Sequence, residues 1–399
     1  MVYHDEKKDE RRAEKRAGRN GAHMGNRSES GRSSNIELLR VVGMLMIVLY
    51  HIVYHAVGFQ LTDTDSIAKW GNAWFCEPAF YKLMLLPVSV IPFGTVGNGL
   101  FILISGYFLV AKGGGVDLGK TAKKLLLQLG FASLVLLVVP TLWYWAGETE
   151  FTSFTQIQTM NDASWFVGYY FALAVIGALF LNRYLLGLER GRYRAFLLVF
   201  LAFAQFTWIG GTLLGGLSGG LRDLCTGLFL YALGGYIRLY APFERIRAGA
   251  VLLLMMLTYA LIALSYYNYT QAKVLALPEG TDFFLQYYSM YANYSPSSLV
   301  LAVSLFELFR RLRLPSSRFV NFLGRATFMV YLIHDNPLFY SLWETQDWVT
   351  TLHDAPAYFM VKLLLWAMGA FAVGTAAYLL YLALGRLFRR YKGLFLKKA

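Results

Sequence analysis

Long apolar runs recur along this chain, and they constrain its fold more than any other feature of the sequence. A helix of about 20 apolar residues is needed to cross the hydrocarbon core of a bilayer. Hydrophobic residues make up 57% of the 399 positions and charged residues only 15%. A soluble domain carries about 25% charged residues, so a soluble fold is disfavoured. The sequence therefore predicts an all-α polytopic membrane protein.

The apolar runs predict about ten transmembrane helices. They cover residues 36–59, 84–110, 125–145, 165–182, 195–212, 221–237, 249–269, 288–309, 319–342 and 357–384. Pro87, Pro92 and Gly94 interrupt the second span, and a short glycine-rich link joins the fifth to the sixth. A membrane helix that is broken in this way can line a cavity.

Charged residues between the spans predict the orientation of the chain. If the N-terminus is cytoplasmic, the even-numbered connections are rich in lysine and arginine, and so is the C-terminal end. The opposite connections carry acidic residues such as Asp63, Glu148 and Asp347. By the positive-inside rule, both termini are predicted to be cytoplasmic. The net charge of +13 then reflects topology, and no nucleic-acid partner is expected.

The chain divides into a membrane domain with a polar segment at each end. Residues 1–35 are dense in mixed charge and lack the apolar core of a cleavable signal peptide, which predicts a disordered cytoplasmic extension. Residues 36–385 form the predicted membrane domain, and residues 386–399 a basic cytoplasmic tail. The two cysteines, Cys76 and Cys225, are too few for a disulfide scaffold, and we predict no metal site.

The first span contains two basic side chains, Arg40 and His51. Eleven positions correspond to about three helical turns, so both leave the same helix face, about 16 Å apart along the axis. Ionisable groups inside a membrane span are costly and usually face a cavity or a partner. Glu37 is spaced for a contact with Arg40. The pattern predicts a reaction channel, while the alternatives are that Arg40 snorkels to the interface and that His51 bridges helices.

Small residues and a glycine-rich loop suggest two further features. Gly94, Gly97 and Gly99 favour close packing between helices. Residues 114–121 fit the phosphate-binding loop pattern of two glycines followed by lysine and threonine. That pattern has meaning only between a strand and a helix, and here it lies between two membrane spans. We therefore do not expect nucleotide hydrolysis.

The ninth span contains a polar sequence that should break its helix. Pro337 has no N–H to donate to Ile333, so the helix should open beside His334 and Asp335. This break predicts either an acceptor site or a helix-bridging cluster. Tryptophan and tyrosine in the outer loops favour an interfacial belt, with stacking on sugar rings as the alternative.

Four segments of the chain resemble acyltransferase family 3, a family of integral membrane proteins. They cover residues 35–51, 93–109, 164–182 and 327–338. The arginine–ten residues–histidine pattern at Arg40 and His51 is the most specific of them, and the segments around Ser105 and His334 are also typical. The resemblance implies transfer of an acyl group, such as acetyl, from cytoplasmic acyl-CoA (acetyl-CoA) to a hydroxyl of a cell-surface polysaccharide or lipid-linked glycan. Acyl-CoA is then a donor substrate, and no permanently bound cofactor is expected.

The resemblance also implies roles for particular residues. His51 would act as base or acyl carrier, and Arg40 would hold a phosphate of the donor. Family members often carry an Arg-x-Arg pair before the third span. Here Lys120, Lys123 and Lys124 supply positive charge there without bidentate forks. The supporting residues are Glu37, Ser105, His334 and Asp335.

The group that orients His51 is left open between Glu307, Asp223 and Asp335. Two other functions also remain open: a secondary transporter, and a non-catalytic membrane component of a glycan export system. A transporter would often show a repeat relating its two halves, and the sequence shows none. The lipid bilayer is a partner in every case.

Overall fold

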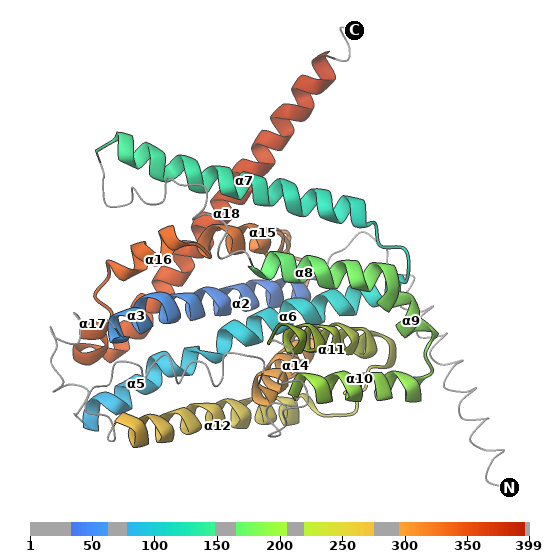
Figure 1. Cartoon of the computed structure of the whole chain (residues 1–399), viewed down its shortest axis with the longest axis horizontal. Coiled ribbons are helices and arrows are strands. Elements are labelled where there is room, and N and C mark those ends of the chain that lie inside the picture. Colours follow the sequence, from blue (N-terminus) through green and yellow to red (C-terminus); the bar gives the residue numbers. More distant parts are fainter. Residues whose placement is uncertain (1–32, 63–77, 148–164, 206–218, 275–294, 396–399) are drawn as a thin grey trace.

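A computed structural model describes residues 33–62, 78–147, 165–205, 219–274 and 295–395, and every regular element in these ranges is helical (Figure 1). The elements are α2 (Ser34–His51), η1 (Ile52–Val57), α3 (Gly58–Thr62), α5 (Pro78–Val90), α6 (Pro92–Leu109), η2 (Val110–Lys112), α7 (Leu118–Trp145), α8 (Trp165–Ile176), η5 (Gly177–Leu181), α9 (Asn182–Gly187), α10 (Arg190–Gln205), α11 (Gly219–Tyr240), α12 (Ala248–Val274), α14 (Pro296–Arg311), α15 (Arg318–His334), α16 (Pro337–Glu344), α17 (Val349–Asp354) and α18 (Pro356–Phe395). The predicted all-α class is confirmed for these residues.

Six of the helical segments are long and apolar enough to cross a membrane. They are Ser34–Gln60, Lys82–Lys112, Leu118–Trp145, Phe166–Gly187, Ala248–Ser265 and Pro356–Arg390. The other four predicted spans fall on α10, α11, α14 and α15, whose described parts are shorter or contain more charged residues. The protein is therefore a membrane protein, while the number of ten spans and the cytoplasmic termini stay predictions.

Helix α2 lies between α6 and α15 in the interior of the bundle. A Cβ atom on Gly97 would lie 2.7 Å from the carbonyl oxygen of Gly43, and one on Gly324 would collide with the Glu37 carboxyl group. Only glycine permits these approaches, since any side chain would push the helices apart. The predicted close packing is thus confirmed at Gly97, where it holds α6 against α2.

Helices α2 and α15 begin together and run in the same direction. The Ser34 hydroxyl donates to Asn321 Oδ1 at 2.9 Å and accepts from the Ser317 backbone N–H at 2.8 Å. Three residues further along α2, Glu37 packs against Gly324 of α15. This register brings the far ends of the two helices together, including His51 and His334.

Two of the predicted spans are broken helices. The second divides at Ile91 into α5 and α6, so the interruption expected at Pro92 is confirmed, while Pro87 lies inside α5 and Gly94 inside α6. The ninth is not one helix over 319–342, because α15 ends at His334 and α16 begins at Pro337. Asn336 caps the new helix by accepting from the backbone N–H groups of Leu338 and Phe339. The predicted break at Pro337 is therefore confirmed, with the amide of Asn336 stabilising it.

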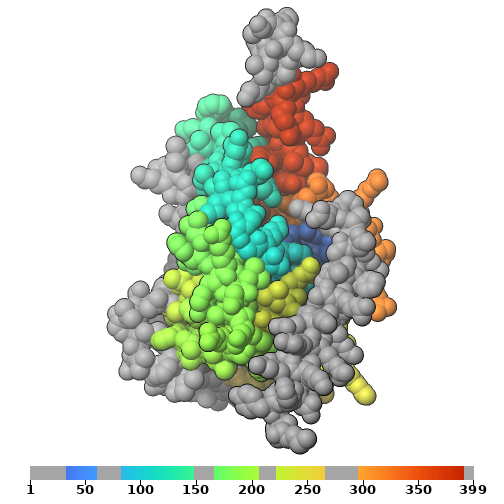
Figure 2. Space-filling model, turned by 90° about the vertical axis from the view of Figure 1, so that its right-hand side faces the viewer, coloured from blue at the N-terminus to red at the C-terminus, as the bar shows by residue number. Residues whose placement is uncertain are grey.

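The basic connections meet at one end of the bundle, which faces the viewer in Figure 2. Asn182 Nδ2 donates to Gly113 O at 3.3 Å, joining the connections after α6 and η5. Asn35 Nδ2 donates to Phe309 O at 3.0 Å, joining the start of α2 to the end of α14. Arg311 donates to Phe243 O at 2.6 Å and so reaches the connection before α12. The side of the membrane that this basic end faces stays a prediction.

Several sequence predictions lie outside the described residues. These are the polar segment up to residue 32, the glycine-rich link within residues 206–218, Cys76, and the acidic positions Asp63 and Glu148. At the other end of the chain, α18 runs to Phe395, so a helix continues into the segment predicted as a basic tail. Figure 1 shows this end of α18 projecting beyond the other helices.

Candidate active site

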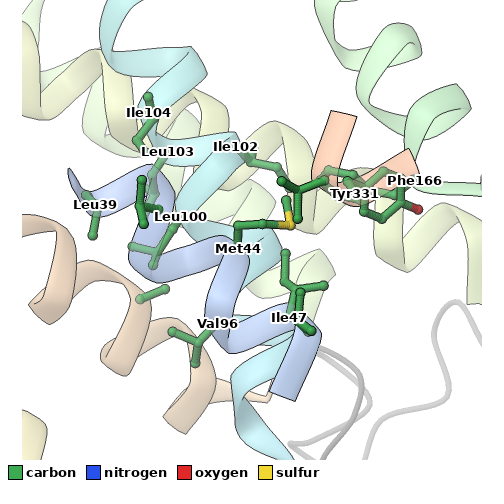
Figure 3. Close-up of a cluster of buried hydrophobic side chains, with 14 of the residues drawn as sticks. Leu39, Met44, Ile47, Val96, Leu100, Ile102, Leu103, Ile104, Phe166 and Tyr331 are labelled. Atoms are coloured by element: carbon green, nitrogen blue, oxygen red, sulfur yellow. The ribbon is translucent and has the colours of Figure 1, made fainter. Parts of the chain in front are cut away.

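A cavity of about 190 Å³ lies along one face of α2. From α2 it is lined by Arg40, Met44 and Ile47, whose spacing places them on one side of the helix. The next position on this face is His51, one turn beyond Ile47, which does not itself line the cavity. The other lining residues are Phe101, Ser105, Lys124, Leu125, Phe166, Val167, Tyr170, Gly324, Arg325, Thr327, Phe328 and Tyr331. In Figure 3 the Met44 side chain extends toward Tyr331 and Phe166.

Three cations from three helices line this cavity: Arg40 of α2, Lys124 of α7 and Arg325 of α15, here called the cationic end. Arg40 Nη1 donates to Glu37 Oε1 at 2.9 Å, as the spacing of the two residues predicted. Glu37 is only 5% exposed, so it holds the guanidinium from the protein side. The cationic end is thus suited to an anionic ligand.

His51, His334 and Asp335 form a second group, here called the histidine cluster. His51 Nδ1 lies 3.1 Å from His334 Nε2 and 3.4 Å from Asp335 Oδ1. His334 is fully buried and Asp335 is 6% exposed. Of the three carboxylates considered as orienters of His51, Asp335 is the one in contact. Glu307 pairs with arginines of α14, and Asp223 lies beside Arg222.

The hydrogen bonds of the cluster assign the protons of the two imidazoles. His334 Nδ1 lies 2.7 Å from Val330 O, and a carbonyl oxygen can only accept, so Nδ1 carries the proton. In the neutral ring, His334 Nε2 is then an acceptor, and His51 Nδ1 donates to it. His51 Nε2 is left with its lone pair. That atom is the one able to accept a proton from a substrate.

Two tyrosines connect Asp335 to its surroundings. The hydroxyls of Tyr340 and Tyr331 both donate to the Asp335 carboxyl group. Tyr331 also lines the cavity, so it joins the cavity wall directly to the histidine cluster. Sequence reasoning missed both tyrosines, although Tyr331 of α15 lies one helical turn before Asp335. Tyr340 lies on α16, so its approach to Asp335 depends on the break between α15 and α16.

The helix changes its winding directly after His51. Residues Ile52–Val57 form a π-helical turn before α3 begins. Such turns are rare and occur frequently at functional sites. The turn carries His55, whose ring stacks on Tyr340 with centroids 3.5 Å apart and planes 8° apart. No sequence signal identified this turn.

The three lysines predicted to bind the donor lie in different surroundings. Lys124 lines the cavity. Lys120 is 87% exposed and lies 3.3 Å from Asp117 Oδ2, while Lys123 is exposed. Asp117 caps α7 by accepting from the Lys120 backbone N–H, and this hydrogen bond lowers the pKa of the Asp117 carboxyl group. The residues that resemble a phosphate-binding loop thus serve as the start of a helix.

Ser105, the remaining supporting candidate, lines the cavity from α6. Its hydroxyl donates to Phe101 O at 2.7 Å and lies 3.0 Å from the Tyr170 hydroxyl. The structure therefore brings Arg40, Lys124 and Ser105 to one cavity. It places His51, His334 and Asp335 in one cluster at the next turn of α2.

The described residues thus form an all-helical membrane protein with a cavity between its helices. A family model described as an acyltransferase domain matches residues 33–386. The chain belongs to this family, acyltransferase family 3, and is a membrane acyltransferase. No curated protein and no solved structure matches the chain.

Proposed function

We propose that this protein moves an acyl group, acetyl in the simplest case, from cytoplasmic acyl-CoA to a hydroxyl of a cell-surface polysaccharide or lipid-linked glycan. One observation carries the proposal: a single face of α2 links the cationic end of the cavity to the histidine cluster. The phosphates of the donor would bind at the cationic end. The pantetheine arm would follow Met44 and Ile47 toward His51.

The orientation of α2 supports the direction of transfer. Arg40 lies nearer the basic end of the bundle, and basic connections favour the cytoplasmic side of a membrane. The histidine cluster lies three turns further along the same helix. In this multi-pass arrangement the donor enters from the cytoplasm, and the glycan approaches His51 from the opposite side of the cell membrane.

The histidine cluster supplies the chemistry as a general base. His51 Nε2 takes the proton of the acceptor hydroxyl while the hydroxyl oxygen attacks the thioester carbonyl carbon. The carbon–sulfur bond then breaks, and the leaving thiolate receives the proton from the imidazolium. Asp335 and His334 hold Nδ1 through this cycle, and the Asp335 carboxylate stabilises the imidazolium. In this direct route no acyl-histidine forms.

The proposal is tested by mass spectrometry of surface glycans from cells with the protein, without it, and with the His51→Ala variant. We expect an acyl-sized mass that disappears in the last two samples, since loss of a general base typically costs about 100- to 10,000-fold in rate. His353→Ala is the matched control, because it removes a histidine that lies on α17 beside Asp354. Full acylation by correctly folded His51→Ala protein would contradict the role of His51.

A further inference from the structure

Arg325 is a cation of the cavity whose charge has no carboxylate partner among the described residues. Its Nε donates to Asn321 O at 3.2 Å, and its guanidinium lies 5.9 Å from the centroid of the Phe322 ring. Within the described ranges, neither terminal nitrogen of this guanidinium has a hydrogen-bond partner. Arg40, by contrast, is ion-paired with Glu37. Arg325 therefore presents to the cavity a planar fork that is not compensated by the protein.

The position of Arg325 along the cavity follows from the register of α2 and α15. The helices run in parallel, and Gly324 packs against Glu37. Arg325 is therefore level with the residue after Glu37, nearer to the basic end of the bundle than Arg40 is. It is also exposed, whereas Gly324 and Thr327 on the same stretch of α15 are buried. Arg325 is thus the outer arginine of the cationic end, and Arg40 is the inner one.

We propose that Arg325 binds the terminal phosphate monoester of the donor, the 3′-phosphate of the nucleotide part of acyl-CoA. This inference rests on the proposed function, which supplies the class of donor. The 3′-phosphate monoester is not part of the chain that leads to the thioester. It should therefore lie farther from His51 than the other phosphates do, beside the outer arginine, Arg325. A guanidinium fork matches two oxygens of one phosphate, whereas an ammonium group offers only a point charge. Arg325 thereby makes the site selective for a 3′-phosphorylated donor.

The test compares two probes on the full-length protein in detergent, CoA and 3′-dephospho-CoA, by isothermal titration calorimetry. We expect the unmodified protein to bind CoA about 10- to 100-fold more tightly, the range for a charge-assisted contact. Arg325→Ala should bind both probes with equal affinity, close to that of the unmodified protein for 3′-dephospho-CoA. Arg325→Lys should keep part of the preference. Arg318→Ala removes an exposed arginine at the start of the same helix, away from the cavity, and should keep all of it.

The outcomes separate this inference from the proposed function. An unchanged preference in Arg325→Ala, or equal binding of both probes by the unmodified protein, overturns the role of Arg325 and leaves acyl-CoA as donor. Equal weakening of both probes by Arg325→Ala also overturns it, since a contact to the 3′-phosphate cannot affect a probe that lacks this group. If the unmodified, folded protein binds neither probe, acyl-CoA is not the donor and both proposals fail. Arg325 is exposed and alanine favours helices, so the variant should fold, and its melting temperature checks this.

Discussion

The two ends of the cavity differ in how the protein satisfies their polar groups. At the cationic end, Arg325 is exposed and Arg40 has a single carboxyl partner, Glu37. In the histidine cluster, by contrast, each polar atom identified as a donor has an acceptor within the protein. His334 donates to Val330 O, and His51 donates to His334. The cationic end can therefore bind an anionic ligand, whereas the hydrogen bonds of the histidine cluster are formed before a ligand binds.

This difference separates two kinds of effect on kinetics. Groups that bind a remote part of the donor equally in ground and transition states change KM. Substitution of groups that position the base lowers kcat, because these groups stabilise the charge that develops on the imidazole in the transition state. Substitutions at the two ends should therefore divide into a kcat class at the histidine cluster and a KM class at the cationic end.

The largest effect in this comparison is expected for Asp335→Asn. The substitution keeps the shape of the side chain but removes the negative charge beside His51 Nδ1, 3.4 Å away. The imidazolium formed during the reaction then loses its stabilisation, and kcat should fall about 100-fold or more. Donor KM should stay unchanged. Steady-state kinetics with acetyl-CoA measure both constants. A rise in KM with normal kcat would contradict this role, because it would mean that Asp335 contributes to donor binding and not to the chemical step.

A smaller loss is expected when the acceptor for His51 Nδ1 is removed. His334→Leu leaves this N–H without its 3.1 Å partner, so the ring loses its fixed orientation and kcat should fall about 10- to 100-fold. His334→Gln restores an acceptor oxygen and should recover most of the rate. The pair is compared by kcat over a pH series on folded protein. Equal rates for both variants would show that the hydrogen bond has no part in positioning His51.

The histidine cluster also shows where sequence reasoning stops. The contact between Glu37 and Arg40 and the break at Pro337 are local, so helix spacing and proline chemistry predicted them. His51 and His334 are 283 residues apart, and their contact depends on the register of α2 against α15. That register is set by Gly324 packing on Glu37 and by Ser34 bonding Asn321. No periodicity within either helix carries this information.

At the cationic end, too, the sequence predicted only what depends on a single helix. Arg40 was found because it shares a helix face with His51, which is a property of one helix. Arg325 was missed, since its place on the cavity follows only from the packing of α15 beside α2 and α7. The π-helical turn after His51 was missed as well, because it lies in an apolar run with ordinary helical composition.

Arg40→Lys is expected to act at the cationic end alone. Lysine keeps the positive charge but cannot grip both Glu37 and a donor phosphate with one planar group. Donor KM should rise about tenfold with little change in kcat, since a tenfold change corresponds to one good hydrogen bond. Initial rates over a range of acetyl-CoA concentrations check this. An unchanged KM would mean that Arg40 serves the packing of α2 against Glu37 and makes no contact with phosphate.

The smallest effects are expected in the first two turns of α7, where Lys120 and Lys124 lie in different surroundings. Lys124 lines the cavity, so Lys124→Ala should raise donor KM about two- to fivefold, in the range of a solvent-exposed ion pair. Lys120 is 87% exposed and pairs with Asp117, so Lys120→Ala should leave KM within about twofold of the unmodified value. The two variants carry the same net charge, and donor KM values at two salt concentrations distinguish a local contact from a general loss of attraction. Equal increases in both variants would mean that the start of α7 attracts the donor only through its overall positive charge, and that Lys124 makes no separate contact from the cavity wall.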